Sequence, residues 1–142
     1  MTSTTTTKEH ARRSELIDKA RVLITKTLPV EDADESSLML SYGGFYLQIS
    51  FSEAHPLMVF YLARTLNRPG GAKDIRRIND LNLKSVLGGH AVNMEAGCYS
   101  YRAAHWLEVE MTKPRFMEML ERHIYEADRA YAHVTRVSEV AG

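Results

Sequence analysis

The sequence contains one cysteine, Cys98, among 142 residues, so the chain cannot form an internal disulfide. No apolar run approaches the ~18 residues of a membrane-spanning helix, and the N-terminal segment lacks the apolar core of a signal peptide. Eighteen basic residues balance eighteen acidic ones, so no net charge attracts nucleic acid or an anionic membrane. We therefore expect a cytoplasmic protein with no membrane partner.

Catalytic and metal-binding signatures are also missing. The chain has neither the G-x-S-x-G nucleophile motif nor a G-x-x-x-x-G-K-[ST] phosphate loop. A calcium loop starting at Asp32 needs glycine at its sixth position and glutamate at its twelfth, where this chain has Ser37 and Gly43. The histidines lack zinc spacing: His10, His55, His90, His105, His123 and His133. The sequence thus predicts no metal, no cofactor and no enzymatic activity.

The first half of the chain predicts a helix followed by a β-hairpin. Residues 1–7 are a polar, threonine-rich stretch that we expect to be a disordered tail. Apolar residues recur at three- and four-residue steps over residues 8–28, which indicates an amphipathic helix. Two β-prone runs, 38–42 and 45–51, flank the pair Gly43–Gly44, which suits a tight hairpin turn.

The second half continues as strand, helix, hairpin and helix. Residues 57–66 are apolar at both alternating sets of positions, which predicts a strand covered on both faces. A short polar helix follows over 73–83, then strands over 86–94 and 98–106. The last helix, 112–137, carries a stripe that includes Phe116 and Leu120 and would pack on the sheet or on a second copy.

These elements give one α+β domain over residues 8–137, in the order α-βββ-α-ββ-α, with residues 138–142 as a C-terminal tail. The sheet is predicted to be antiparallel, with five strands and flanking helices. So few helices leave part of the apolar surface uncovered, and we expect a peptide or a second subunit to bury it. We therefore expect a homodimer that binds a protein or peptide segment. The candidate peptide-binding residues are aromatic: Tyr42, Tyr46, Tyr61 and Trp106.

Two alternative functions remain open at this point. A small-molecule sensor or minor enzyme would use His105 with Glu108 and Glu110, and would have a pocket of several hundred Å³ closed around His105. A nucleic-acid binder would use the basic residues between positions 64 and 84, but that stretch lacks aromatic residues to stack on bases, so we disfavour it. These basic residues are Arg64, Arg68, Lys73, Arg76, Arg77 and Lys84.

Three motifs in the second half resemble a known family. They are INDLNL at 78–83, the strand pair that follows, and HIYEADRAYAHV at 123–134. In this order they resemble the YbjN family of bacterial sensory-transduction regulators, which is similar to the type III secretion chaperones. The resemblance implies a secretion-chaperone-like fold, frequent homodimerisation and binding of a peptide or protein without catalysis. It also implies helix-capping and loop-bonding roles for Asn79 and Asn82, and it supplies no catalytic residue.

Overall fold

The computed structural model describes residues 2–52, 54–107 and 110–140. Three helices are present: α1 (Thr2–Thr27), α2 (Ala72–Lys84) and α3 (Lys113–Val140). Six strands form one antiparallel sheet in the order β1-β2-β3-β4-β6-β5. Their bounds are β1 (Asp32–Ala33), β2 (Ser37–Tyr42), β3 (Phe45–Ser52), β4 (Leu57–Thr65), β5 (Gly89–Asn93) and β6 (Cys98–Trp106). The predicted α+β class and antiparallel sheet are confirmed.

The first hairpin turns at the predicted glycine pair. Tyr42 pairs with Phe45, so Gly43 and Gly44 are the two turn residues. Both have positive φ angles, +58° and +85°, which residues with a side chain rarely adopt. A turn with these angles matches the twist of the flanking strands. The register of β2 on β3 therefore follows from this turn, and it places alternate residues of both strands on the same face.

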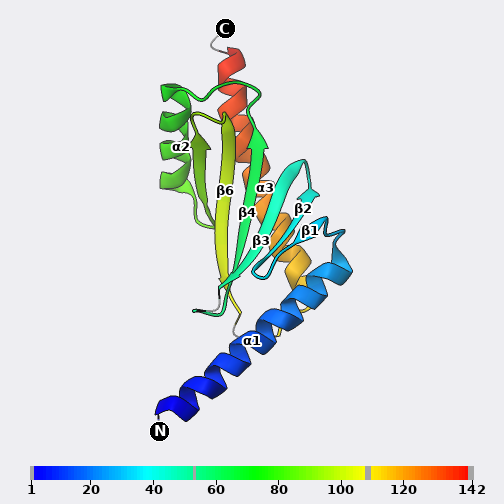
Figure 1. Cartoon of the computed structure of the whole chain (residues 1–142). Coiled ribbons are helices and arrows are strands. Elements are labelled where there is room, and N and C mark those ends of the chain that lie inside the picture. Colours follow the sequence, from blue (N-terminus) through cyan, green and yellow to red (C-terminus); the bar gives the residue numbers. More distant parts are fainter. Residues whose placement is uncertain (1, 53, 108–109, 141–142) are drawn as a thin grey trace.

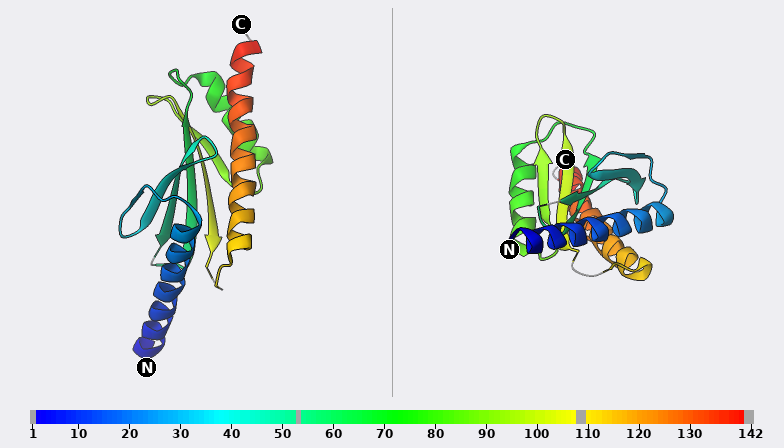
Figure 2. Two further views of the ribbon diagram at one scale, coloured as in Figure 1. Left: turned by 90° about the vertical axis from the view of Figure 1, so that its right-hand side faces the viewer. Right: turned by 60° about the horizontal axis from the view of Figure 1, so that its bottom comes forward.

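One face of the sheet forms the core together with α1 and α3. Figures 1 and 2 show α3 running along this face, while α1 crosses the end of the sheet. Every second residue of the central strands is fully buried there, including Leu47, Phe60 and Tyr101. The helices contribute apolar side chains to the same core: Ile17, Ala20, Ile24 and Leu28 from α1, and Phe116, Leu120, Ala127 and Val134 from α3.

The opposite face carries no helix of the described chain (Figure 1). We call it the open face. Its residues on β4, among them Val59 and Tyr61, are half-buried rather than buried. The expectation that this strand is covered on both faces is therefore wrong, because all the described helices pack on the other side or beside the edge strand β5.

Helix α2 lies beside β5 and is held at both ends by side chains. At its start, Asp74 accepts a hydrogen bond from the Gly71 N–H and two from the Arg68 guanidinium, at 2.8 Å each. The hydrogen bonds from Arg68 hold the pKa of the Asp74 carboxyl below its ordinary value. Near its end, Asn82 accepts a hydrogen bond from the His90 N–H at 2.7 Å and donates one to the His90 carbonyl at 2.9 Å, which joins the helix to β5. The resemblance implied this loop-bonding role for Asn82, whereas Asn79 is exposed on α2.

The structure differs from the sequence predictions at several boundaries. A two-residue strand, β1, pairs with β2, so the sheet has six strands instead of five. The strand predicted from Val86 begins at Gly89, because Val86 and Leu87 lie in an exposed loop. Helix α1 begins at Thr2 within the predicted tail, and α3 continues to Val140 beyond the predicted end of the domain. Within the described ranges, no helix is long and apolar enough to cross a membrane.

Candidate functional site

Three of the four predicted peptide-binding aromatics lie on the open face. Tyr61 on β4 pairs with Gln48 on β3 and with Arg102 on β6. Tyr46 is one strand away and 43% exposed, and Trp106 at the end of β6 is 62% exposed. The structure therefore brings Tyr46, Tyr61 and Trp106 onto one accessible surface.

The fourth predicted residue, Tyr42, lies on the opposite face. It has the same orientation as Leu38 and Leu40, which are buried, and its hydroxyl donates a hydrogen bond to Glu121 on α3. This hydrogen bond and burial raise the pKa of Tyr42 to about 12. Tyr42 thus joins the hairpin to α3 and is separated from the other three aromatics by the thickness of the sheet. The sequence placed Tyr42 with the other three aromatics because the Gly43–Gly44 turn interrupts the alternation of faces between Tyr42 and Tyr46.

The open face is polar on β2 and β3 and more apolar on β4 and β6. Gln48 accepts a hydrogen bond from the Tyr46 hydroxyl at 3.2 Å and donates to Ser37 and Ser50 at 3.4 and 3.3 Å. Val59 and Ala104 pair on the neighbouring strands. The open face therefore combines aromatic and aliphatic surface with hydroxyl and amide groups.

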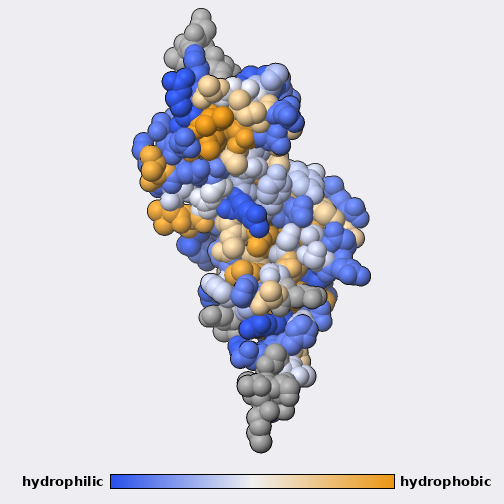
Figure 3. Space-filling view, turned by 60° about the vertical axis from the view of Figure 1, so that its left-hand side comes forward, coloured by the Kyte–Doolittle hydropathy of each residue, from blue (hydrophilic) through white to orange (hydrophobic). Residues whose placement is uncertain are grey.

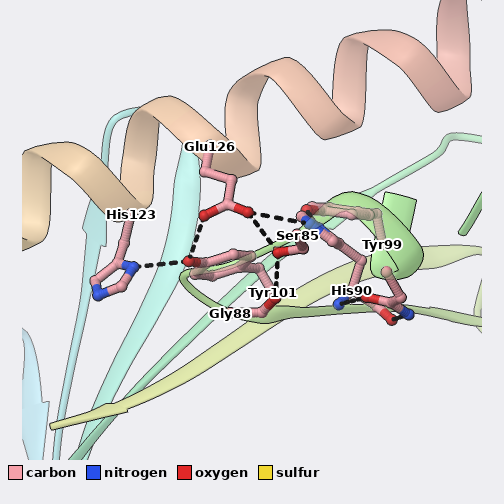
Figure 4. Close-up of polar contacts among 8 residues, drawn as sticks. Ser85, Gly88, His90, Tyr99, Tyr101, His123 and Glu126 are labelled. Atoms are coloured by element: carbon pink, nitrogen blue, oxygen red, sulfur yellow. Dashed lines mark hydrogen bonds and ion pairs between the residues drawn. The ribbon is translucent and has the colours of Figure 1, made fainter. Parts of the chain in front are cut away.

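A hydrogen-bonded network lies on the other side of the sheet, between β6, β5, α3 and the loop after α2 (Figure 4). His105 and His123 approach through their Nε2 atoms at 2.6 Å, and His123 Nδ1 lies 2.7 Å from the Tyr101 hydroxyl. Tyr101 donates to Glu126 at 3.0 Å, and Ser85 donates to the same carboxylate at 2.6 Å. The network continues to His90, whose Nε2 is 3.6 Å from Glu126 and whose Nδ1 is 2.7 Å from the Tyr99 hydroxyl.

The hydrogen bonds fix where the protons lie when the histidines are neutral. Tyr101 gives its single hydroxyl proton to Glu126, so its oxygen accepts from His123 Nδ1–H. His123 Nε2 then accepts from His105 Nε2–H. Burial, and to a smaller extent the nearby His105, lowers the pKa of His123 from its ordinary 6.5 to about 4. Burial also lowers the pKa of His105 and of His90 and raises the pKa of Tyr99 and of Tyr101. These shifts favour the uncharged forms of the three histidines and the two tyrosines.

A groove of about 770 Å³ lies beside this network, between α2, the 85–88 loop and α3. Its lining includes Leu81, Ser85, His90, Tyr125, Glu126 and Ala130. Its rim carries exposed aliphatic residues on the side of the molecule with α2, where Figure 3 shows apolar patches among polar surface. Val86 is 93% exposed and Leu87 is 51% exposed, and both line the groove. This groove has the volume of a ligand site, but its lining does not include His105.

The two described residues of the sensor alternative, His105 and Glu110, are not gathered into a site. His105 faces His123 rather than a carboxylate, and Glu110 is exposed and lies 3.9 Å from Lys19. Glu108 lies outside the described residues. Among the described residues, no group of three histidine, cysteine, aspartate or glutamate side chains is placed to hold a metal ion.

Three residues of the basic stretch are partly buried and bind other parts of the chain. Arg64 lies over the Tyr131 ring at 4.4 Å and 3.9 Å from Asp128, and Arg68 binds Asp74. Arg77 donates to the Val134 carbonyl at 3.4 Å. These three side chains stabilise packing of the helices, which leaves a smaller basic surface on α2 than the sequence suggested.

Sequence reasoning missed the network as a unit. The sequence shows His90 and His123 among scattered histidines and does not single out Glu126. The available signals were the alternation of Tyr99 and Tyr101 on one face of β6 and the three-residue spacing of His123 and Glu126 on one face of α3. Neither signal shows that these two faces meet, because that depends on how α3 packs on the sheet.

Comparisons with known proteins find similarity in structure. No protein-family model and no curated protein matches the chain. The crystal structure of YbjN from E. coli matches with a TM-score of 0.59 at 11% identity, covering 88% of this chain and 93% of that one. A chain of the HopA1–SchA chaperone–effector complex matches with a TM-score of 0.52 at 15% identity, covering 80% and 87%. The expected resemblance is confirmed in the fold, which this chain shares with YbjN and with a chain of a chaperone–effector complex.

Proposed function

We propose that this protein is a non-enzymatic, chaperone-like regulator that binds an extended segment of a partner protein on its open face. The observation that carries the proposal is the placement of Tyr46, Tyr61 and Trp106 together on a sheet face that no described helix covers. Aromatic residues supply much of the binding energy at protein interfaces. The shared fold with a chain of a chaperone–effector complex supports the same function.

The proposal includes a homodimer in the cytoplasm. The sequence predicted a dimer because the last helix and the aromatic strands offer more apolar surface than so few helices can cover, and the part of this reason that concerns the last helix no longer applies because Phe116, Leu120 and Val134 are buried. A different surface supports the dimer. Leu83, Val86 and Leu87 are exposed together at the end of α2, and a second copy would remove this aliphatic patch from water.

Selection from a displayed library of random peptides tests the function. Peptides that bind the wild-type protein should lose at least tenfold in affinity on a Tyr61→Ala, Trp106→Ala double variant, because hot-spot aromatics cost about 2 kcal/mol or more on truncation. A Tyr125→Ala variant is the matched control, since Tyr125 is an exposed aromatic in the groove on the other side of the molecule. Peptides that lose affinity only on the Tyr125 variant would show that the groove, and not the open face, is the binding site.

A further inference from the structure

The open face carries a row of paired residues with opposite charges at its two ends. Across the strands the register runs from Asp32 on β1 to Met39, Gln48, Tyr61 and finally Arg102 on β6. Cross-strand partners point to the same face of a sheet. Asp32 and Arg102 are the charged strand residues of this face among those that the structure describes, and both are exposed.

Neither charge is neutralised within the described part of the chain. Asp32 accepts a hydrogen bond from the neighbouring Ala33 N–H at 2.9 Å and forms no ion pair there. Arg102 pairs on β5 with Gly89, which has no side chain to contact it, and none of the described carboxylates lies within salt-bridge distance. An acidic group above Arg102 and a basic group above Asp32 would therefore be complementary to this face.

The separation of the two charges defines the segment that fits. Four strand-to-strand steps of ~4.8 Å place Asp32 and Arg102 about 19 Å apart. Two residues six positions apart in an extended chain are separated by about 20 Å, at ~3.3 Å per step. An even number of steps also places their side chains on the same side of the extended segment.

We propose that the open face binds an extended partner segment that carries one acidic and one basic side chain six residues apart. The acidic side chain lies on Arg102, the basic side chain lies on Asp32, and the side chains between them contact Tyr61 and Met39. This inference rests on the proposed function and specifies the chemistry of its partner.

A single segment fits this face better than a second copy of the sheet does. Face-to-face packing of two sheets would remove the amide and hydroxyl groups of the face from water, which costs free energy for every hydrogen bond to water that the bonds within the face, such as those of Gln48, do not replace. A segment that crosses the strands leaves these groups in contact with water. The charge row then determines the position of the segment, and the aromatics supply the apolar contact.

Charge-swap variants with the selected peptides test the inference. Peptides that require Tyr61 and Trp106 should be enriched in an acidic and a basic residue six positions apart. Their synthetic versions should bind Asp32→Lys or Arg102→Glu about two- to fivefold more weakly, as for an exposed ion pair, and should regain affinity on the double variant, where the segment binds in reverse. Arg129→Glu on α3, an exposed charge on the helix that covers the other face of the sheet, is the control and should change nothing.

Each single variant also has its own expected specificity. Asp32→Lys makes both ends of the row basic and should prefer a peptide with two acidic residues six apart, while Arg102→Glu should prefer two basic residues. Peptides that need the aromatics but show no charge preference would overturn this inference and leave the proposed function intact. Loss of dimer mass in the single variants, restored in the double variant, would instead make the row a contact between copies. Failure to select any peptide that depends on Tyr61 and Trp106 would overturn both.

Discussion

Acidification should destabilise this fold through its buried histidines, and His123 provides the clearest case. Its ring is buried between β6 and α3, where Nδ1 donates to Tyr101 and Nε2 accepts from His105. Adding a proton to Nε2 places a charge in a buried site and puts two N–H donors opposite each other until His105 moves its own proton to Nδ1. Burial therefore favours neutral His123.

The size of the effect follows from the pKa of His123, which burial lowers from 6.5 to about 4. Between these values the unfolded chain binds more protons than the folded one, so the free energy of unfolding rises with pH in this window. The stabilisation from neutral His123 is complete above about pH 6.5 and is lost as the pH falls through about 4. It amounts to roughly 3 kcal/mol.

Urea unfolding of the wild type and of His123→Gln from pH 7 to pH 4 measures the contribution of neutral His123 to the free energy of unfolding. Carboxylates titrate in both proteins, so the difference between the two curves isolates His123. We expect the wild type to lose roughly 3 kcal/mol more than the variant over this range. Leu120→Ala is the control: it removes a buried side chain without a titratable group, so its curve should run parallel to the wild-type curve. A His123→Gln curve that is also parallel would refute the reasoning.

Three further predictions concern stability and assembly. Leu120→Ala should lower the free energy of unfolding by about 2 to 5 kcal/mol because Leu120 is completely buried. Glu121→Ala should lower it by about 1 kcal/mol or less, because it removes only an exposed hydrogen bond from Tyr42. Equal losses in urea unfolding would show that the buried face of α3 is misassigned. Gly97→Ala should lower the melting temperature, because φ is +59° and the new Cβ would lie 2.0 Å from a backbone oxygen; an unchanged melting temperature would contradict this geometry. Light scattering at micromolar concentration should give twice the 16.1 kDa chain mass, and Val86→Ser should shift it toward the monomer; a monomeric wild type would disprove the dimer.

Local sequence patterns predicted most of the fold. The alternation around Phe45 and the Gly43–Gly44 turn are contained within one hairpin, and the stripe with Phe116 and Leu120 is contained within one helix. Such short-range patterns determine which side of an element is apolar. They do not determine which face of the sheet the helices choose, and for this reason the prediction of a doubly covered strand at 57–66 was wrong.

The candidate site depended more strongly on long-range structure. Tyr42 and Tyr46 are four positions apart in sequence, but the intervening two-residue turn places them on opposite faces. The charge row needs five strands to be in register, and β1, which supplies Asp32, is too short to be recognised from two residues. The histidine network needs α3 to pack across β6, which no pattern within either element specifies.

The central claim, that the open face binds a partner segment, is tested most directly by NMR. Amide chemical shifts of the labelled protein are mapped as a peptide selected from the displayed library is added. The account predicts that the largest changes lie on β3, β4 and β6 around Tyr61, Arg102 and Trp106, with little change along α3. Changes concentrated around Leu87 and Tyr125 in the groove, with the open face unaffected, would contradict it.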